Sequence, residues 1–169
     1  MTAIETLLAI EEIKVLFARR VRAMDQKNWA EYDLLHAPDA VLKSFSDDQA
    51  GLAPLGSHGG SLAAVGKAAI LESIRTLLDG PVKVTTVHHA HTPEIEITSD
   101  TTATGVWAME DMLWWDDAGE TQHAHGYGHY YETYVKLDGV WLIASRTIRR
   151  LRMDTTPDFF RYLKTEAST

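Results

Sequence analysis

The sequence predicts an α+β fold, a cone-shaped barrel in which three N-terminal helices pack on a curved, mostly antiparallel sheet. Helical spacing of apolar residues is confined to the first half of the chain, and long strand-like runs fill the second half. The connections between these runs are short, so neighbouring strands must be antiparallel. Asp138-Gly139, between the last two runs, is a strong β-hairpin signal.

Size and composition indicate one globular domain with an ordinary core. The chain has 169 residues, of which 45% are hydrophobic and 24% are charged. Its net charge of −8 argues against nucleic acid and anionic membranes as partners. The absence of cysteine excludes disulfides, thiol nucleophiles and thiolate metal ligands. The first residues open a helix with no long apolar run, so we expect a cytoplasmic protein without a targeting peptide or membrane span.

The first two helices are expected near the N-terminus. Apolar side chains recur every three or four positions over residues 3–24, which is typical of an amphipathic helix. Thr2 and Glu5 have the spacing of a capping box at its start. A shorter helix should follow at 29–35 and end before Pro38, because proline disfavours helix in the residue before it.

A short strand at 40–45 leads into a glycine-rich segment at 46–61. Loops of this length in a small domain often act as lids or binding loops, and a plain loop is the alternative. The third helix is expected over 67–78 and should stop at Gly80.

The remainder of the domain is predicted to be a four-stranded meander. We expect one domain over residues 1–155 and a tail at 156–169, which forms a short helix near 157–167 or frays. The glycines within the runs would relieve bending of long strands. The four runs are 82–97, 102–115, 121–136 and 140–151.

Three histidines inside one strand are an unusual use of a titratable side chain. Strand alternation places His88 on one face and His89 with His91 on the other. One of these faces must look into the domain, so the two sets are rival candidates for the chemistry.

A metal site is an alternative use for these histidines. His89-x-His91-x-x-Glu94 resembles a cupin ligand pattern, and His123-x-His125 repeats the His-x-His spacing. A jelly roll would not begin with helices, and the cupin glycine framework is missing. We therefore expect no metal and no other cofactor.

Several stretches together resemble a known family. Met24-Asp25 ends the first helix, His91-Thr92-Pro93-Glu94-Ile95 ends the first strand run, and Asp138-Gly139-Val140-Trp141 forms the last hairpin. Over about residues 4–152 the chain resembles the nuclear-transport-factor-2-like (SnoaL-like) cone family. Within that family it is most similar to the bile-acid 7α-dehydratases, and more distantly to scytalone dehydratase and hexachlorocyclohexane dehydrochlorinase.

The resemblance implies an Asp–His dyad that drives elimination. Asp25 falls on the dyad aspartate and His88 on the dyad histidine. Arg146 occupies the arginine position of the dehydrochlorinase and Arg150 that of the bile-acid dehydratases. These two arginines have the same strand parity, so they should face the same side. Arg20 replaces a pocket tyrosine of the bile-acid enzymes, which suits a different or more anionic substrate.

Elimination of water from a hydroxy-ketone needs a base, an acid and a group that holds the enolate oxygen. His88 would serve as base and acid, Asp25 would orient it, and Arg146 or Arg150 would stabilise the oxyanion. Each residue has a simpler alternative role. His88 is then a strand histidine with its hydrogen bonds satisfied, and Asp25 is a turn residue. The two arginines are then paired with carboxylates on the neighbouring strand.

The residues and the resemblance together predict a cofactor-independent dehydratase, a carbon–oxygen lyase, for a hydrophobic, steroid-like or polycyclic hydroxy-ketone. Arg20, Trp107 and Tyr130 are candidates for substrate binding, with a core role the alternative for Trp107. An isomerase or polyketide cyclase, or a non-catalytic small-molecule-binding module, remain open. The resemblance also implies a homo-oligomer, with a trimer favoured over a dimer.

Overall fold

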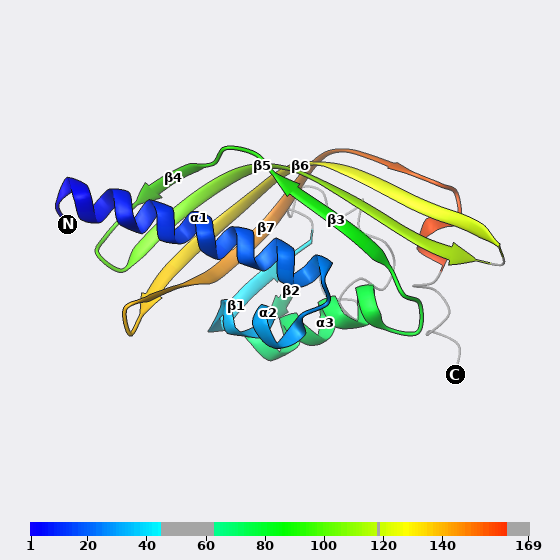
Figure 1. The fold of residues 1–169 in the computed structure, drawn as a ribbon, viewed down its shortest axis with the longest axis horizontal. Coiled ribbons are helices and arrows are strands. Elements are labelled where there is room, and N and C mark those ends of the chain that lie inside the picture. The colour runs from blue at the N-terminus through cyan, green and yellow to red at the C-terminus, as the bar shows by residue number, and fades with distance from the viewer. Residues whose placement is uncertain (45–62, 118, 162–169) are drawn as a thin grey trace.

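A computed structural model describes residues 1–44, 63–117 and 119–161 (Figure 1). It contains three helices and seven strands within these ranges. Their order along the chain is α1 (Ala3–Asp25), α2 (Trp29–Leu34), β1 (His36–Lys43), β2 (Ala63–Val65), α3 (Lys67–Asp79), β3 (Thr85–Ala90), β4 (Glu94–Ile97), β5 (Thr102–Asp117), β6 (Glu120–Leu137) and β7 (Val140–Thr155).

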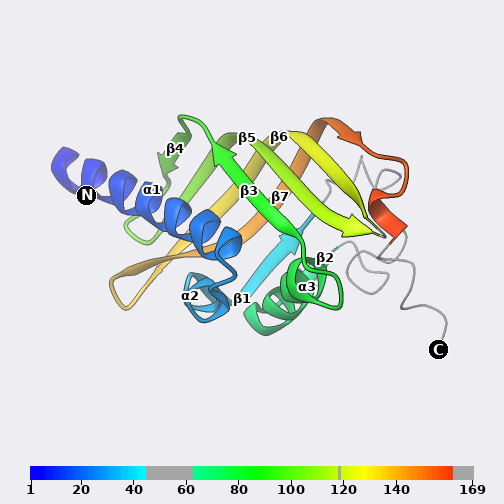
Figure 2. The ribbon, with the colours of Figure 1, turned by 45° about the vertical axis from the view of Figure 1, so that its right-hand side comes forward.

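The strands form one mixed, mostly antiparallel sheet in the order β2-β1-β7-β6-β5-β3, with β4 also paired to β5. Only the β1–β7 pair is parallel in this sheet of described strands. Figures 1 and 2 show that the sheet is curved and that the helices lie on its hollow side. α1 contacts β3, β4 and β7, and α3 packs on β1 and β2. The predicted α+β cone is therefore confirmed.

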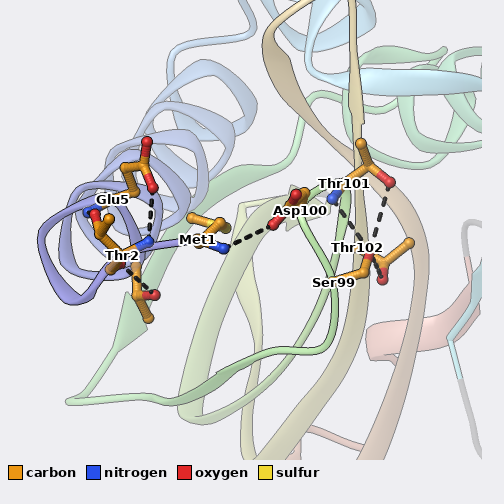
Figure 3. Close-up of polar contacts among 8 residues, drawn as sticks. Met1, Thr2, Glu5, Ser99, Asp100, Thr101 and Thr102 are labelled. Atoms are coloured by element: carbon orange, nitrogen blue, oxygen red, sulfur yellow. Dashed lines mark hydrogen bonds and ion pairs between the residues drawn. The ribbon is translucent and has the colours of Figure 1, made fainter.

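The start of α1 is fixed by the predicted capping box. The Glu5 backbone N–H donates to Thr2 Oγ1 at 3.3 Å, and the Thr2 backbone N–H donates to Glu5 Oε2 at 2.6 Å (Figure 3). The Met1 ammonium also pairs with Asp100 in the turn before β5, at 3.1 Å (Figure 3). The helix ends at Asp25, and Lys27 with φ 57° turns the chain away.

Two strand predictions differ from the structure. The run 82–97 is not one strand but two, β3 and β4, because Pro93 has no N–H to donate to a ladder. β1 begins at His36, several residues before the predicted start. It tolerates Pro38 because the β1–β7 register shifts between His36 and Val41, so that proline lies in an irregularity.

The other element predictions are close to the observed bounds. α3 and the hairpin at Asp138-Gly139 lie where expected, and both hairpin residues have positive φ, 50° and 82°. In the tail, a single 3₁₀ turn at 159–161 places Phe159 in the core, where it is 2% exposed. The predicted loop at 46–61 and the end of the predicted tail helix lie outside the described residues.

The core consists of two hydrophobic clusters, one under α1 and one between α3 and β1. Polar side chains are also buried on the inner side of the sheet, and they define the candidate site below. They include Arg20, His36, Thr86, Asp111, Glu132 and Arg146. None of the helices in the described ranges has the length and apolar character needed to cross a membrane.

Candidate active site

Asp25, the last residue of α1, contacts His88 in the middle of β3. Its Oδ1 lies 2.6 Å from His88 Nδ1. Its Oδ2 accepts the His88 backbone N–H at 3.0 Å, and Oδ1 also accepts the Thr86 hydroxyl at 2.8 Å. Lys27 donates to that hydroxyl at 2.9 Å. Strand alternation puts Thr86 and His88 on the same inner face, so three donors from one strand orient the carboxylate.

The local environment sets the charge of this pair. Burial acts to raise the pKa of Asp25, but the contacts with His88 and Thr86 outweigh it, and the pKa lies below its ordinary value. Burial also lowers the pKa of His88, even though Asp25 acts in the opposite direction. Near neutral pH the pair is therefore a carboxylate and a neutral imidazole. We assign the proton to Nδ1, which donates to Asp25, and this leaves Nε2 as a base.

A second carboxylate stands beside the imidazole. Asp111 on β5 is the direct cross-strand partner of His88. Arg150 binds it through two bonds, Nη1 to Oδ1 at 2.8 Å and Nη2 to Oδ2 at 2.7 Å. Burial would raise the pKa of Asp111, but Arg150 holds it below its usual value. A Cβ on Gly126 would collide with the ends of both side chains, so a larger residue there would displace the pair from its present geometry.

Arg20 from α1 and Arg146 from β7 are buried beside one ring. Their Cζ atoms lie 4.9 Å and 5.5 Å from the centroid of Tyr130. Within the described part of the chain, no nitrogen of Arg20 and neither Nε nor Nη1 of Arg146 has a hydrogen-bond partner. A buried donor left unpaired costs about 1–3 kcal/mol, so such groups call for an explanation, often a functional one. Burial, followed by the charge of Asp111, raises the pKa of Tyr130 to about 12, so its phenol stays protonated.

Glu132 on β6 is a neighbour of both arginines. It is the cross-strand partner of Arg146, and its Oε1 is 3.4 Å from Arg20 Nη2. Its Oε2 accepts the Tyr134 hydroxyl at 2.6 Å, and that hydroxyl accepts the Trp107 indole N–H at 2.8 Å. A chain of hydrogen bonds thus runs from the core to Glu132.

His36, the first residue of β1, completes the inner polar set. It is 5% exposed, and its Nδ1 donates to the Tyr32 carbonyl at 2.9 Å. Burial, with the positive charge of Arg146, lowers the pKa of His36 to about 3. This imidazole therefore remains neutral at physiological pH, with Nε2 as an acceptor.

The structure brings most of the predicted site residues together. Asp25 and His88 are in contact, and Arg146 and Arg150 share the inner face, as their parity predicted. Arg150 is engaged by Asp111, whereas Arg146 keeps unused donors. Trp107 is a core residue stacked on Phe17 at 3.8 Å, with its N–H bound to Tyr134, so its assignment to substrate binding stays a prediction.

Sequence reasoning missed three polar residues of the site. His36, Asp111 and Glu132 were not predicted to belong to it, yet all three are buried. The available signal was strand parity. Asp111 lies on the same face as Trp107, and Glu132 lies on the same face as Tyr130, so charged residues occupy core positions of strands.

The rival histidines lie on the outer face of the sheet. His89 Nδ1 is 3.2 Å from Glu110 Oε1, and His125 Nε2 is 2.9 Å from Glu110 Oε2. His91 lies beyond the end of β3, and Glu94 begins β4. Across residues 1–44, 63–117 and 119–161, no group of three or more histidine, aspartate or glutamate side chains is placed to hold a metal ion.

Comparison with solved structures shows that the chain shares its fold with several proteins of low sequence identity. A protein assigned as a scytalone dehydratase, from Novosphingobium aromaticivorans DSM 12444, has a TM-score of 0.73 at 19% identity, covering 92% of each chain. The type 3 hexachlorocyclohexane dehydrochlorinase from Novosphingobium barchaimii LL02 has a TM-score of 0.73 at 13% identity, covering 92% of this chain and 95% of that one. A type 2 hexachlorocyclohexane dehydrochlorinase has a TM-score of 0.74 at 15% identity, covering 92% and 93%.

The sequence itself matches a family profile over most of its length. The SnoaL-like domain profile covers residues 5–147, which include most of the first helix, the strand with His88 and the arginine Arg146. The narrower resemblance to bile-acid 7α-dehydratases stays a prediction. The fold, the topology and this match lead to one conclusion: the chain belongs to the SnoaL-like domain family.

Proposed function

We propose that this protein is a cofactor-independent lyase that removes water from a hydrophobic hydroxy-ketone. One observation carries the proposal: the 2.6 Å contact between Asp25 and His88, in which a fully oriented carboxylate holds a neutral imidazole. Such a pair supplies a base of suitable pKa without any bound cofactor. The fold relatives named as a dehydratase and as dehydrochlorinases support this reading, because both names denote eliminations.

The reaction is proposed to use one imidazole twice. His88 Nε2 takes a proton from the carbon next to the ketone, and the electron pair moves onto the ketone oxygen as an enolate. The enolate then reforms the carbonyl and expels the hydroxyl group from the β carbon. The protonated His88 returns its proton to that hydroxyl, so water leaves and the imidazole is neutral again.

Arg146 is the better candidate for the enolate oxygen than Arg150. Both terminal nitrogens of Arg150 are bound to Asp111, so it neutralises that carboxylate beside His88. Nε and Nη1 of Arg146 have no partner in the described ranges, and they lie in a buried environment where a donor stabilises developing charge strongly. Arg20 and Tyr130 are proposed to contact the substrate beside it.

The test is turnover of a panel of β-hydroxy-ketones with polycyclic skeletons, followed by mass spectrometry and by the absorbance of the enone product. H88A and D25A should abolish turnover and keep the fold, and R146M should lower kcat by about 10²–10³. H89A is the matched control, because His89 lies on the outer face of the same strand. Near-wild-type turnover in H88A or D25A would overturn the proposal, and a product of unchanged mass would indicate an isomerase or cyclase instead.

We further propose that the protein forms a trimer through the outer face of the sheet. That face carries half-buried or exposed apolar side chains, Met112, Trp114 and Tyr131 among them, in a position to meet another subunit. Light scattering coupled to size-exclusion chromatography would measure the mass directly. A monomeric or dimeric mass would contradict this assembly.

A further inference from the structure

Lys27 occupies a backbone position that normally belongs to glycine. α1 ends in a Schellman motif, in which the Lys27 backbone N–H donates to the Met24 carbonyl at 3.2 Å and the Asn28 backbone N–H donates to the Ala23 carbonyl at 2.8 Å. The residue after the C-cap of such a motif is left-handed, and Lys27 has φ 57°. Glycine and asparagine adopt this conformation more readily than lysine does. A lysine held there calls for a reason in its side chain.

The Lys27 side chain reaches the hydroxyl group that binds Asp25. Its Nζ donates to Thr86 Oγ1 at 2.9 Å, and Thr86 Oγ1 donates to Asp25 Oδ1 at 2.8 Å. Burial lowers the pKa of Lys27, but the negative charges of Asp25 and Asp79 oppose this effect, and the amine stays charged near neutral pH. Thr86 is 4% exposed, so bulk water does not compete for its hydroxyl.

The chemistry of these groups fixes the direction of the hydrogen bonds. An ammonium group has three hydrogens and no acceptor, so Thr86 must accept the bond from Lys27. The single hydrogen of the Thr86 hydroxyl cannot point to Lys27 and is directed at its other partner, Asp25 Oδ1. That oxygen therefore already accepts one hydrogen where it meets His88 Nδ1 at 2.6 Å.

This direction decides where the imidazole carries its proton. A carboxylate oxygen that accepts a hydrogen from Thr86 is stabilised as the anion, so the hydrogen between Asp25 and His88 belongs to Nδ1. The neutral ring then keeps its lone pair on Nε2. Without the amine, the Thr86 hydroxyl is free to turn and accept a hydrogen instead, and the two neutral forms of the imidazole become closer in energy.

We propose that Lys27 is a positioning residue that, through Thr86 and Asp25, keeps the proton of the neutral His88 ring on Nδ1. The use of Nε2 as the base rests on the proposed function. The position of the proton is a property of the free protein and does not depend on catalysis.

Two substitutions of Lys27 separate this role from a role in the turn alone. K27G removes the amine and also relieves the left-handed backbone, so it should be at least as stable in urea as K27M. K27M removes the amine and keeps the long apolar stem and the backbone strain. If Lys27 served only the turn, K27G would leave His88 unchanged.

The experiment is nitrogen NMR of the whole protein with isotope-labelled histidine, at a pH where His88 is neutral. Protonated and unprotonated ring nitrogens resonate far apart, and the His88 signals are identified by their loss in H88A. Wild type should show the Nδ1–H form. In both K27G and K27M the ratio of the Nδ1–H form to the Nε2–H form should fall by about tenfold or more, because a charge-assisted hydrogen bond is lost.

Three further variants control the measurement. T86V breaks the same chain and should match K27M, whereas T86S keeps the hydroxyl and should keep the wild-type ratio. K83M is the matched lysine control, because the exposed Lys83 donates to the Asp79 carboxylate at 3.0 Å and should leave the ratio unchanged. A dominant Nε2–H form in wild type, or a wild-type ratio in K27G or in K27M, would overturn the proposal.

Turnover separates this inference from the proposed reaction. If the elimination takes place, K27M should lower kcat by about tenfold with little change in KM, because the loss affects the base and not substrate binding. If the ratio shifts as expected and no hydroxy-ketone is dehydrated, the positioning role of Lys27 stands and the elimination is wrong.

Discussion

Asp111 lies directly across the β3–β5 ladder from His88, and both of its oxygens bind Arg150. The imidazole therefore has two carboxylate neighbours, one that bonds to it and one that is neutralised by an arginine. This arrangement keeps the second negative charge from acting fully on His88, whose pKa stays low.

R150M should disturb both the fold and the base. It leaves the Asp111 carboxylate buried and unpaired, and breaking such a pair costs about 3–5 kcal/mol of unfolding free energy. The uncompensated charge should also raise the His88 pKa. Urea unfolding measures the first effect, and the double variant R150M/D111N should recover most of the loss; an additive double variant would contradict the coupling.

G126A should destabilise the protein by displacing the Asp111–Arg150 pair. The added methyl group would collide with Arg150 and Asp111 and force the pair apart, at a cost of about 1–3 kcal/mol for overpacking alone. Urea unfolding of G126A would show this loss. G139N is the control, because Gly139 has open space around it and asparagine tolerates its φ of 82°. Equal stability of the two variants would contradict the close approach.

His36 should make stability depend on pH. Its folded pKa of about 3 lies below the unfolded value of about 6.5, so the unfolded state binds more protons between these limits. The free energy of unfolding therefore falls as the pH drops below 6.5, and His36 accounts for about 1.4 kcal/mol of this loss per pH unit. Urea unfolding of wild type and H36Q at pH 7 and pH 5 isolates this term. Parallel losses in both proteins would exclude His36 as its source.

Activity should persist into mildly acidic solution. His88 must be neutral to act as a base, and its pKa lies below 6.5 because burial disfavours the charged ring. The acidic limb of kcat/KM is therefore expected below pH 6.5. In R150M the limb should move to higher pH, since Asp111 then stabilises the charged imidazole. An unmoved limb would show that another group controls the rate.

The sequence was sufficient for the parts of the fold that depend on local patterns. The capping box at Thr2, the hairpin at Asp138 and the face of His88 all follow from spacing of a few residues. It was insufficient where distant strands decide the outcome. The β1 start depends on a register shift against β7, and the pairing of Asp111 with Arg150 depends on the β5–β6–β7 order. Parity showed that Arg146 and Arg150 share a face, but only their partners distinguish their roles.

α1 is fastened at both of its ends. At one end the Met1 ammonium pairs with Asp100, an exposed contact of small energy, and at the other Asp25 is bonded three times to β3. A slide of the helix by a single turn, about 5.4 Å, would separate Asp25 from His88 and carry Arg20 away from Tyr130. The position of the helix therefore sets the geometry of the whole site. Substitutions along its buried face, even far from His88, should weaken His88 as a base by moving Asp25.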